Sequence, residues 1–374
     1  MIIFNSNKMD SNKYTAFKNA KVFNSLDGLR FLSIMPVVWH HTPARELTNI
    51  TLLKRGFLGV DLFFVISGFL IVTLLLRENE KTNYISLRKF YIRRSLRIFP
   101  LYYAVILFYA ILYAVVFPGS ENGRQYISEI WIYLTYTSNY FPVILSVVWS
   151  LATEEQFYLL WPTIEKFFKK YIPYILVVVL VINQLINFHV GGVLFTEITG
   201  WHIPYDLAVM QATFTPILLG VTLAHMLNNP TTFVWMQKVV GYRIMPIIFL
   251  AILLLLCEYD AGDISGLPRL SIQIIMMLLL ASCVVNEKHY LTPILTNSVV
   301  MRIGAISYGI YLLHMLCIDV TIKSLHYFKV SNELIIFLFA ACVSIAVAEI
   351  SYRYYEVPFL RYKERFSVIR QRHA

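Results

Sequence analysis

The sequence predicts an all-α membrane protein, a polytopic bundle of transmembrane helices. Hydrophobic residues make up 58% of its 374 residues and only 14% are charged, whereas soluble domains have about 25% charged residues. The apolar residues gather in runs close to the ~20 residues that a helix needs to cross a bilayer. Lysine and arginine gather between alternate runs, the pattern of a polytopic protein.

Ten apolar runs follow one another along the chain, so we expect about ten spans. No soluble block separated by a linker interrupts them, and we expect a single transmembrane domain. The runs cover residues 27–43, 57–76, 98–117, 147–168, 172–188, 207–227, 243–257, 269–285, 303–322 and 333–352.

The positions of lysine and arginine orient this bundle. Basic connections remain on the cytoplasmic side of a membrane, and here cations precede the first run and recur in every second connection. Both termini are therefore expected in the cytoplasm. We expect a cytoplasmic tail over residues 1–25, the transmembrane domain over 26–358 and a short basic cytoplasmic tail over 359–374.

The net charge of +10 is explained first by this topology and by attraction to anionic lipid headgroups. Nucleic acid is therefore not expected as a partner. The four cysteines lie singly in or beside apolar runs, without the spacing of a metal site, so we expect neither a metal nor a permanently bound cofactor. They are Cys257, Cys283, Cys317 and Cys342.

The first run carries two ionisable groups on one helical face. Arg30 and His41 are 11 positions apart, which at about 100° per residue points them nearly the same way, about 16 Å apart along the axis. A neutral imidazole can take a proton from a hydroxyl group. The alternative is a histidine that simply lies at the interface. Pro36 is expected to kink this helix, and His40 points about 80° away from the shared face.

The second run contains a carboxylate, Asp61, among apolar residues and glycines. An intramembrane carboxylate is costly, so we expect Asp61 to orient a histidine or to accept a hydrogen bond from a substrate hydroxyl. The alternative is a position at the outer interface. Gly59 and Gly68 are expected to let helices pack closely.

A basic segment leads directly into the third run and carries Arg94 and Arg97. Residues three apart share a helical face, and paired guanidinium groups suit phosphate and pyrophosphate. The alternative is that these cations serve topology alone.

The fourth run begins with adjacent acids, Glu154 and Glu155. Neighbouring residues of a helix point about 100° apart. We therefore expect one carboxylate to face the bundle and the other to meet solvent or a partner arginine. The alternative is stabilisation of the helix N-terminus through its dipole.

The ninth run carries a polar ladder, because Tyr308, Tyr311 and His314 follow one another at steps of three. A second polar segment, Tyr352–Pro358, follows the tenth run. Tyrosines near a membrane interface are also common as aromatic belt residues.

In this order the segments resemble the acyltransferase 3 family, integral membrane acyltransferases that modify surface and secreted glycans. The resemblance covers nearly the whole chain. It depends on the Arg30 to His41 spacing, Gly59–Phe69, Arg94–Arg97, Trp149–Tyr158 and Ser307–His314.

The resemblance implies an acyl-coenzyme A donor, most simply acetyl-coenzyme A, supplied as a co-substrate from the cytoplasm. It implies a glycan or lipid-linked saccharide acceptor and a bacterial inner membrane. By the same resemblance, Arg30 and His41 take the two essential positions of the first helix. Arg94 and Arg97 match the second arginine pair, which we expect to bind the donor, and Glu154 matches the acidic position.

We therefore expect His41 to act as general base, with transient acylation of His41 as a variant. Catalytic roles are expected for His41, Arg30, Glu154 and Asp61, donor binding for Arg94 and Arg97, and substrate binding for Tyr308, His314 and Glu155. The residues after the last run are too few for the hydrolase-like domain of some relatives, so the chain is expected to act alone or with a partner. A homo-oligomer is compatible with the sequence. The alternative function is a carrier or flippase for a glycan or small anion, although no paired broken spans favour it.

Overall fold

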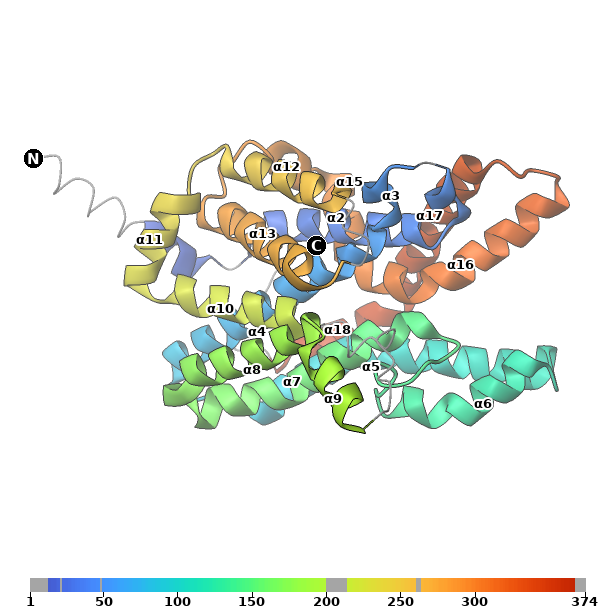
Figure 1. Cartoon of the computed structure of the whole chain (residues 1–374), viewed down its shortest axis with the longest axis horizontal. Helices are drawn as coiled ribbons and strands as arrows, with labels where there is room; N and C mark the ends of the chain where they lie inside the picture. Colours follow the sequence, from blue (N-terminus) through green and yellow to red (C-terminus); the bar gives the residue numbers. More distant parts are fainter. Residues whose placement is uncertain (1–12, 21, 48, 200–213, 260–263, 367–374) are drawn as a thin grey trace, which may run out of the picture. The chain divides into compact units, whose positions relative to one another are not determined.

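The computed structural model describes residues 13–20, 22–47, 49–199, 214–259 and 264–366, and all regular structure within them is helical, as predicted (Figure 1). The helices form two compact units, each built from two separate stretches of chain. Unit 1 combines the residues up to Ile85 with Pro216–Ser307. Unit 2 combines Ser86–Thr215 with Tyr308–Ser367.

Unit 1 is arranged around α2 (Ser25–His40), which packs against α4 (Gly59–Thr82) and α15 (Ser298–Ala305). Leu29 and Val37 are completely buried and lie eight positions apart on one face of α2. Helices α12 (Met245–Glu258) and α13 (Gly266–Val285) run side by side (Figure 1). The other elements of this unit are η1 (Pro43–Glu46), α3 (Thr51–Lys54), η2 (Gly56–Leu58), α10 (Phe214–Asn228), α11 (Pro230–Val240) and α14 (Thr292–Leu295).

Two glycines of α4 allow its neighbours to approach closely, as the sequence predicted. A Cβ atom on Gly59 would lie 2.1 Å from the carbonyl oxygen of Ser33 in α2. A Cβ atom on Gly68 would lie 2.1 Å from the carbonyl oxygen of Ile217 in α10. Any larger residue at either position would push one helix away from the other.

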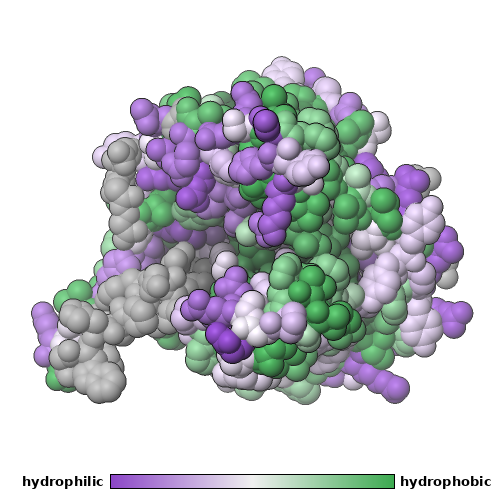
Figure 2. Space-filling view, turned by 90° about the vertical axis from the view of Figure 1, so that its right-hand side faces the viewer, coloured by the Kyte–Doolittle hydropathy of each residue, from purple (hydrophilic) through white to green (hydrophobic). Residues whose placement is uncertain are grey.

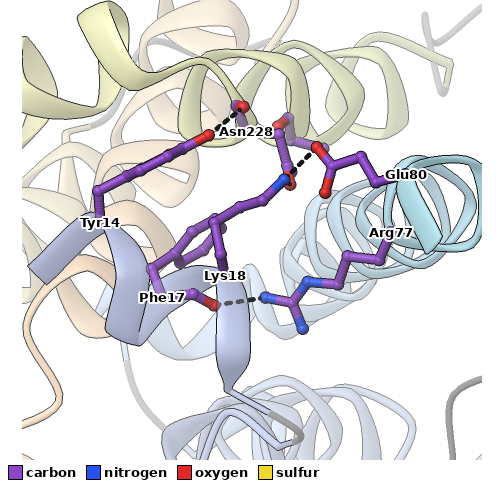
Figure 3. Close-up of polar contacts among 7 residues, drawn as sticks. Tyr14, Phe17, Lys18, Arg77, Glu80 and Asn228 are labelled. Carbon is purple, nitrogen blue, oxygen red and sulfur yellow. Dashed lines mark hydrogen bonds and ion pairs between the residues drawn. The ribbon is translucent and has the colours of Figure 1, made fainter. Parts of the chain in front are cut away.

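The residues before α2 are more than a tail, because residues 13–19 form a helix that contacts the rest of unit 1. Figure 3 shows Arg77 of α4 pointing at the end of this helix, where its guanidinium donates hydrogen bonds to the carbonyl oxygens of Phe17 (2.7 Å) and Ala20 (2.6 Å). On the other side, the hydroxyl of Tyr14 donates to the carbonyl oxygen of Asn228 (2.7 Å). These bonds tie the segment to α4 and α10.

Aromatic packing supports the same segment. The ring of Phe17 lies 5.6 Å from that of Phe23 and 5.4 Å from that of Phe233 in α11. Lys18 forms an ion pair with Glu80 of α4 (Figure 3). The structure therefore shows residues 13–20 and 22–25 as an integral part of unit 1, whereas their cytoplasmic location stays a prediction.

Unit 2 is arranged around α5 (Leu87–Ile111), which packs against α6 (Glu121–Leu134), α7 (Trp149–Phe167) and α18 (Val357–Glu364). Helix α5 begins at Leu87 because the side chain of Ser86 accepts a hydrogen bond from the amide of Lys89. The other elements are η3 (Leu112–Val116), η4 (Ser146–Val148), η5 (Lys169–Tyr171), α8 (Ile172–Asn187), α9 (Val190–Thr199), α16 (Ser307–Tyr327), α17 (Glu333–Ser351) and η7 (Tyr352–Glu356).

Tyrosines fasten α5 to α6, neighbours in Figure 1. The hydroxyl of Tyr102 donates to the carbonyl oxygen of Tyr133, and the hydroxyl of Tyr126 donates to that of Ile106, each at 2.8 Å. All three tyrosine side chains are fully buried. Because each helix donates to the other, the pair is fixed in register.

Among the described residues, six helices are long and apolar enough to cross a membrane, or up to seven if α11 and α12, which meet at a bend of 72°, are counted as one span. The six belong to α4, α5, α8, α13, α16 and α17. The other three predicted spans contain α2 with 16 residues, α10 with 15, and α7, which carries four charged residues among its 19. Residues 207–213 of the predicted sixth span lie outside the described residues. The number ten and the placement of both termini thus stay predictions.

Large apolar side chains are exposed along these helices, as lipid contact requires. Figure 2 shows them over broad areas of one face. On α8, Val177, Val178 and Val181 are each more than half exposed, and on α17 so are Leu338 and Phe339. Soluble proteins rarely expose apolar patches beyond a few hundred Å². The chain is an integral, multi-pass membrane protein.

Candidate functional site

The predicted site residues fall into two groups, one in each unit. Unit 1 contains Arg30, His41 and Asp61. Unit 2 contains the rest: Arg94, Arg97, Glu154, Glu155, Tyr308 and His314.

Arg30 lies within α2, and His41 is the C-cap residue directly after its last residue, His40. The helix continues through Pro36 without interruption. Arg30 forms an ion pair with Asp27, 2.6 Å away and one turn earlier, and both side chains are about one-fifth exposed. The guanidinium thus has a carboxylate partner at the start of α2.

The imidazole of His41 is fixed by its own helix. Its Nδ1 lies 2.8 Å from the carbonyl oxygen of Val37. A carbonyl oxygen only accepts hydrogen bonds, so Nδ1 carries the proton and, in the neutral ring, Nε2 carries the lone pair. This is the tautomer that a general base needs at Nε2.

The Nδ1 atom of His40 also bonds to a backbone carbonyl, but to one outside its own helix. Its Nδ1 lies 2.9 Å from the carbonyl oxygen of Lys54, which follows α2 by 14 positions. The two histidine rings meet edge to face at 5.3 Å between centroids, and the ring of Phe57 lies 5.4 Å from that of His40. Both imidazoles therefore present Nε2 as the basic nitrogen, and geometry alone does not separate their roles.

Asp61 is buried in an ion pair. It is 1% exposed, and its two oxygens lie 3.0 Å and 2.9 Å from nitrogens of Arg269, itself 5% exposed. The side-chain amide of Gln273 donates a further hydrogen bond of 3.0 Å. The guanidinium also lies 5.7 Å from the ring centroid of Phe57. Asp61 therefore links α4 to α13 in the interior of unit 1, and its predicted catalytic role stays a prediction.

Arg94 contacts both predicted acids. Its Nη2 is 3.6 Å from Glu154 and its Nε is 3.5 Å from Glu155, and the two carboxylates are 13% and 12% exposed. The expectation that the acids diverge, with only one meeting arginine, is wrong. The planar guanidinium offers nitrogens on different edges, so a single fork reaches carboxylates from adjacent positions.

Arg97 faces the C-terminal part of the chain. It lies close enough to Glu356 and to Lys363 to interact with their charges. Glu356 is 8% exposed and accepts a hydrogen bond of 3.2 Å from Ser351. A Cβ on Gly309, in the predicted polar ladder, would lie only 3.4 Å from the same carboxylate.

The polar ladder of α16 is bonded to other helices at each step. The hydroxyl of Tyr308 donates to the carbonyl oxygen of Ile98 in α5 (2.6 Å). The hydroxyl of Tyr311 donates to the carbonyl of Val147 and accepts from Ser150, both at 2.7 Å. The ladder therefore joins α16 to α5 and to the start of α7.

His314 completes the ladder. It is fully buried, and its Nδ1 lies 2.6 Å from the carbonyl oxygen of Tyr311. As in His41, the proton is on Nδ1 and the lone pair of the neutral ring is on Nε2. The substrate-binding roles predicted for Tyr308, His314 and Glu155 stay predictions.

Three residues of these clusters had no predicted role. Arg269 stood at the edge of an apolar run, and Gln273 one turn later was its only local signal. The ring of Tyr158, four positions after Glu154, lies 3.7 Å from the guanidinium carbon of Arg94. Its lack of charge gave no sign of this contact in the sequence. Among the described residues, no group of three or more His, Cys, Asp or Glu side chains is arranged to hold a metal ion.

The sequence matches the acyltransferase 3 family, described as an acyltransferase domain, over residues 23–353. A Staphylococcus aureus (strain COL) protein with the provisional name O-acetyltransferase SACOL0978 is 31% identical over 382 residues, covering 92% of this chain and 58% of that protein. The peptidoglycan O-acetyltransferase OatA of Listeria monocytogenes is 30% identical, covering 92% of this chain and 57% of that protein. The O-acetyltransferase OatA of Staphylococcus aureus (strain NCTC 8325) is 29% identical, covering 89% and 56%.

The chain thus spans a little over half the length of these relatives. No solved structure matches it significantly.

Proposed function

Since the chain belongs to the acyltransferase 3 family, we propose that it is a membrane-bound O-acetyltransferase. It moves an acetyl group from acetyl-coenzyme A, supplied by the cytoplasm, to a hydroxyl of a surface or exported glycan. The names of the relatives favour an acetyl group, and that of the Listeria relative favours peptidoglycan as acceptor. The setting that we propose is a bacterial inner membrane.

The hydrogen bond from His41 Nδ1 to the carbonyl of Val37, 2.8 Å long, is the observation that carries the mechanism. Nε2 takes the proton of the acceptor hydroxyl as its oxygen attacks the thioester carbonyl. The tetrahedral intermediate collapses, the carbon–sulfur bond breaks and the coenzyme leaves as a thiolate. The imidazolium then returns the proton to this thiolate.

The arginines serve the donor in this proposal. Arg94 and Arg97 bind the phosphates of the coenzyme with charge-assisted hydrogen bonds. The ion pairs of Arg94, at 3.5 and 3.6 Å, are longer than the ~2.7–2.9 Å of a close pair. A phosphate can therefore engage Arg94 without first breaking a tight contact. Arg30 guides the donor from the start of α2.

The acids have supporting roles. Glu154 balances the charge of Arg94 when no phosphate is bound and contributes to orienting the sugar. Asp61 acts through Arg269, which it holds by an ion pair of 2.9 Å, so its contribution is to shape the interior around α4. Tyr308, His314 and Glu155 line the part of unit 2 that receives substrate.

Acyl transfer by the purified full chain tests this function. The assay offers radiolabelled acetyl-coenzyme A and extracted peptidoglycan to wild type, His41→Ala and His40→Ala at matched amounts. Loss of a general base costs about 10²–10⁴-fold in rate, so we expect this loss in His41→Ala and near wild-type transfer in His40→Ala. A wild-type rate in His41→Ala contradicts the assignment. If wild type transfers to no acceptor while membranes move a labelled glycan or anion, the protein is a carrier.

A further inference from the structure

The C-terminal segment reaches the same end of unit 2 as the arginines of α5. Helix α17 continues through η7 and α18, and Glu333–Glu364 form 32 helical residues. At 1.5 Å per residue this is about 48 Å, well beyond the ~30 Å hydrocarbon thickness. Because the apolar residues end near Ile350, the remaining part of this helix, Ser351–Glu364, extends past the hydrocarbon layer.

Helix α5 is built in the opposite order, with its cations before its apolar part. Helix α18 packs against α5, and a guanidinium nitrogen of Arg93 donates a hydrogen bond of 2.9 Å to the carbonyl of Phe366. The charged end of α18 therefore lies beside the charged end of α5.

This arrangement places one lysine among three arginines. The half-buried Lys363 lies close enough to Arg93, Arg94 and Arg97 for all three charges to act on its ammonium group. Like charges at short range repel one another, and more so away from bulk water. The adjacent Glu364 compensates part of this charge.

Three further acids lie near the arginines. Arg94 lies between Glu154 and Glu155, and Arg97 faces Glu356, whose oxygen is fixed by Ser351 at 3.2 Å. These acids come from α7 and η7, whereas Lys363 belongs to the last turn of α18. Three arginines and one acid act on Lys363, and this excess of positive charge favours an anion with more than one charge.

We propose that Lys363, together with Arg93 and Arg97, forms a subsite for a phosphate group of the acyl donor. This inference rests on the proposed function, because the phosphate is that of acetyl-coenzyme A. Lysine supplies a point charge and arginine a planar fork, and both bind phosphate.

A comparison of two acetyl donors, one with phosphate groups and one without, separates phosphate recognition from other effects of a substitution. Acetyl-coenzyme A carries phosphates, whereas acetyl-pantetheine has the same thioester without them. We expect Lys363→Gln to raise the KM for acetyl-coenzyme A about tenfold, the loss of one charged hydrogen bond, with kcat unchanged. The KM for acetyl-pantetheine should stay at the wild-type value, and Lys363→Arg should restore most of the donor affinity.

Arg361→Gln is the matched control, because it removes an exposed positive charge from the same helix. It should leave both KM values unchanged. Thermal unfolding of each variant identifies loss of folding, and a variant that unfolds early is replaced by Lys363→Met, which keeps the length of the side chain.

An unchanged KM for acetyl-coenzyme A in Lys363→Gln overturns the subsite and leaves the proposed function intact. An equal rise for both donors, or the same rise in Arg361→Gln, also overturns it. Wild type that transfers acetyl from neither donor overturns the proposed function, and the subsite with it.

Discussion

The guanidinium carbon of Arg94 lies 3.7 Å from the centroid of the Tyr158 ring. This is well within the ~6 Å range of a cation–π contact. Tyr158, Glu154 and Glu155 all belong to α7, so one helix supplies both the ring under the guanidinium and the acids beside it. The ring fixes the plane of Arg94 while its ion pairs stay loose, an arrangement suited to a residue that exchanges carboxylate for phosphate.

The ring contact predicts different outcomes for two substitutions of Tyr158. Tyr158→Leu removes the π face, worth about 0.5–2 kcal/mol, and should raise the KM for acetyl-coenzyme A several-fold. Tyr158→Phe keeps the ring and should bind the donor like wild type. Steady-state transfer assays measure both values. Equal KM values in the Leu and Phe variants would show that the stacking contributes nothing.

Replacement of the arginines should weaken donor binding before it slows the chemical step. Arg94→Ala and Arg97→Ala each lose charge-assisted hydrogen bonds, which are worth about 1.5–3 kcal/mol, so we expect a rise of tenfold or more in the apparent KM for acetyl-coenzyme A. Donor titrations at saturating acceptor provide the measurement. If both variants keep the wild-type apparent affinity, the phosphates bind elsewhere.

The ion pair of Asp61 and Arg269 should dominate the stability of unit 1. Removal of one partner leaves a buried, uncompensated charge and costs about 3–5 kcal/mol, so Asp61→Leu and Arg269→Leu should each unfold at markedly lower temperature in detergent. The double variant should lose much less free energy of unfolding than the two single variants lose together. Full additivity would show that the charges do not stabilise each other.

Activity of the same double variant defines the role of Asp61. A stable but inactive double variant would assign Asp61 a catalytic role, and a stable and active one would assign it to structure. For the stability measurement, Glu80→Leu is a suitable control. It breaks an ion pair whose carboxylate is half exposed, and such pairs contribute about 0–1 kcal/mol to stability.

The helices were predictable from sequence because an apolar run is a local property. Most pairs of charged side chains were not predictable from sequence. Asp61 and Arg269 are 208 positions apart, and no periodicity connects them. The contact of Arg94 with two adjacent carboxylates was not predicted for another reason. Helical angles describe where the Cβ atoms of the two acids point, whereas the long arginine side chain can reach both carboxylates. The docked helix before α2 was missed because its composition is that of a polar tail.

The docking of that helix predicts how it responds to protease. Arg77 holds two carbonyl oxygens at 2.6 and 2.7 Å, a bidentate contact that an ammonium group cannot reproduce. In Arg77→Lys we therefore expect trypsin to cleave after Lys13 and Lys18 several times faster than in wild type. Lys81→Ala, an exposed change at the end of the same α4, is the control. Identical cleavage rates in all three proteins would mean that other contacts are sufficient to hold this helix in place.

The close approach of α4 to α2 predicts a steric effect at Gly59. In Gly59→Ala the new methyl group would meet a backbone oxygen at 2.1 Å, and overpacking of this kind costs about 1–3 kcal/mol. In Gly309→Ala the nearest atom is a side-chain methyl at 3.3 Å, so the loss should be smaller. Thermal unfolding in detergent compares the two. A greater loss in Gly309→Ala would be incompatible with the observed packing.

The interleaved construction of unit 1 has a consequence for biosynthesis. A ribosome adds about 5–20 residues per second, so the 208 positions between Asp61 and Arg269 correspond to about 10–40 s of translation. During that interval α4 has been synthesised but the arginine that pairs with Asp61 has not. The interior of unit 1 is therefore completed only when α13 arrives and Arg269 pairs with Asp61.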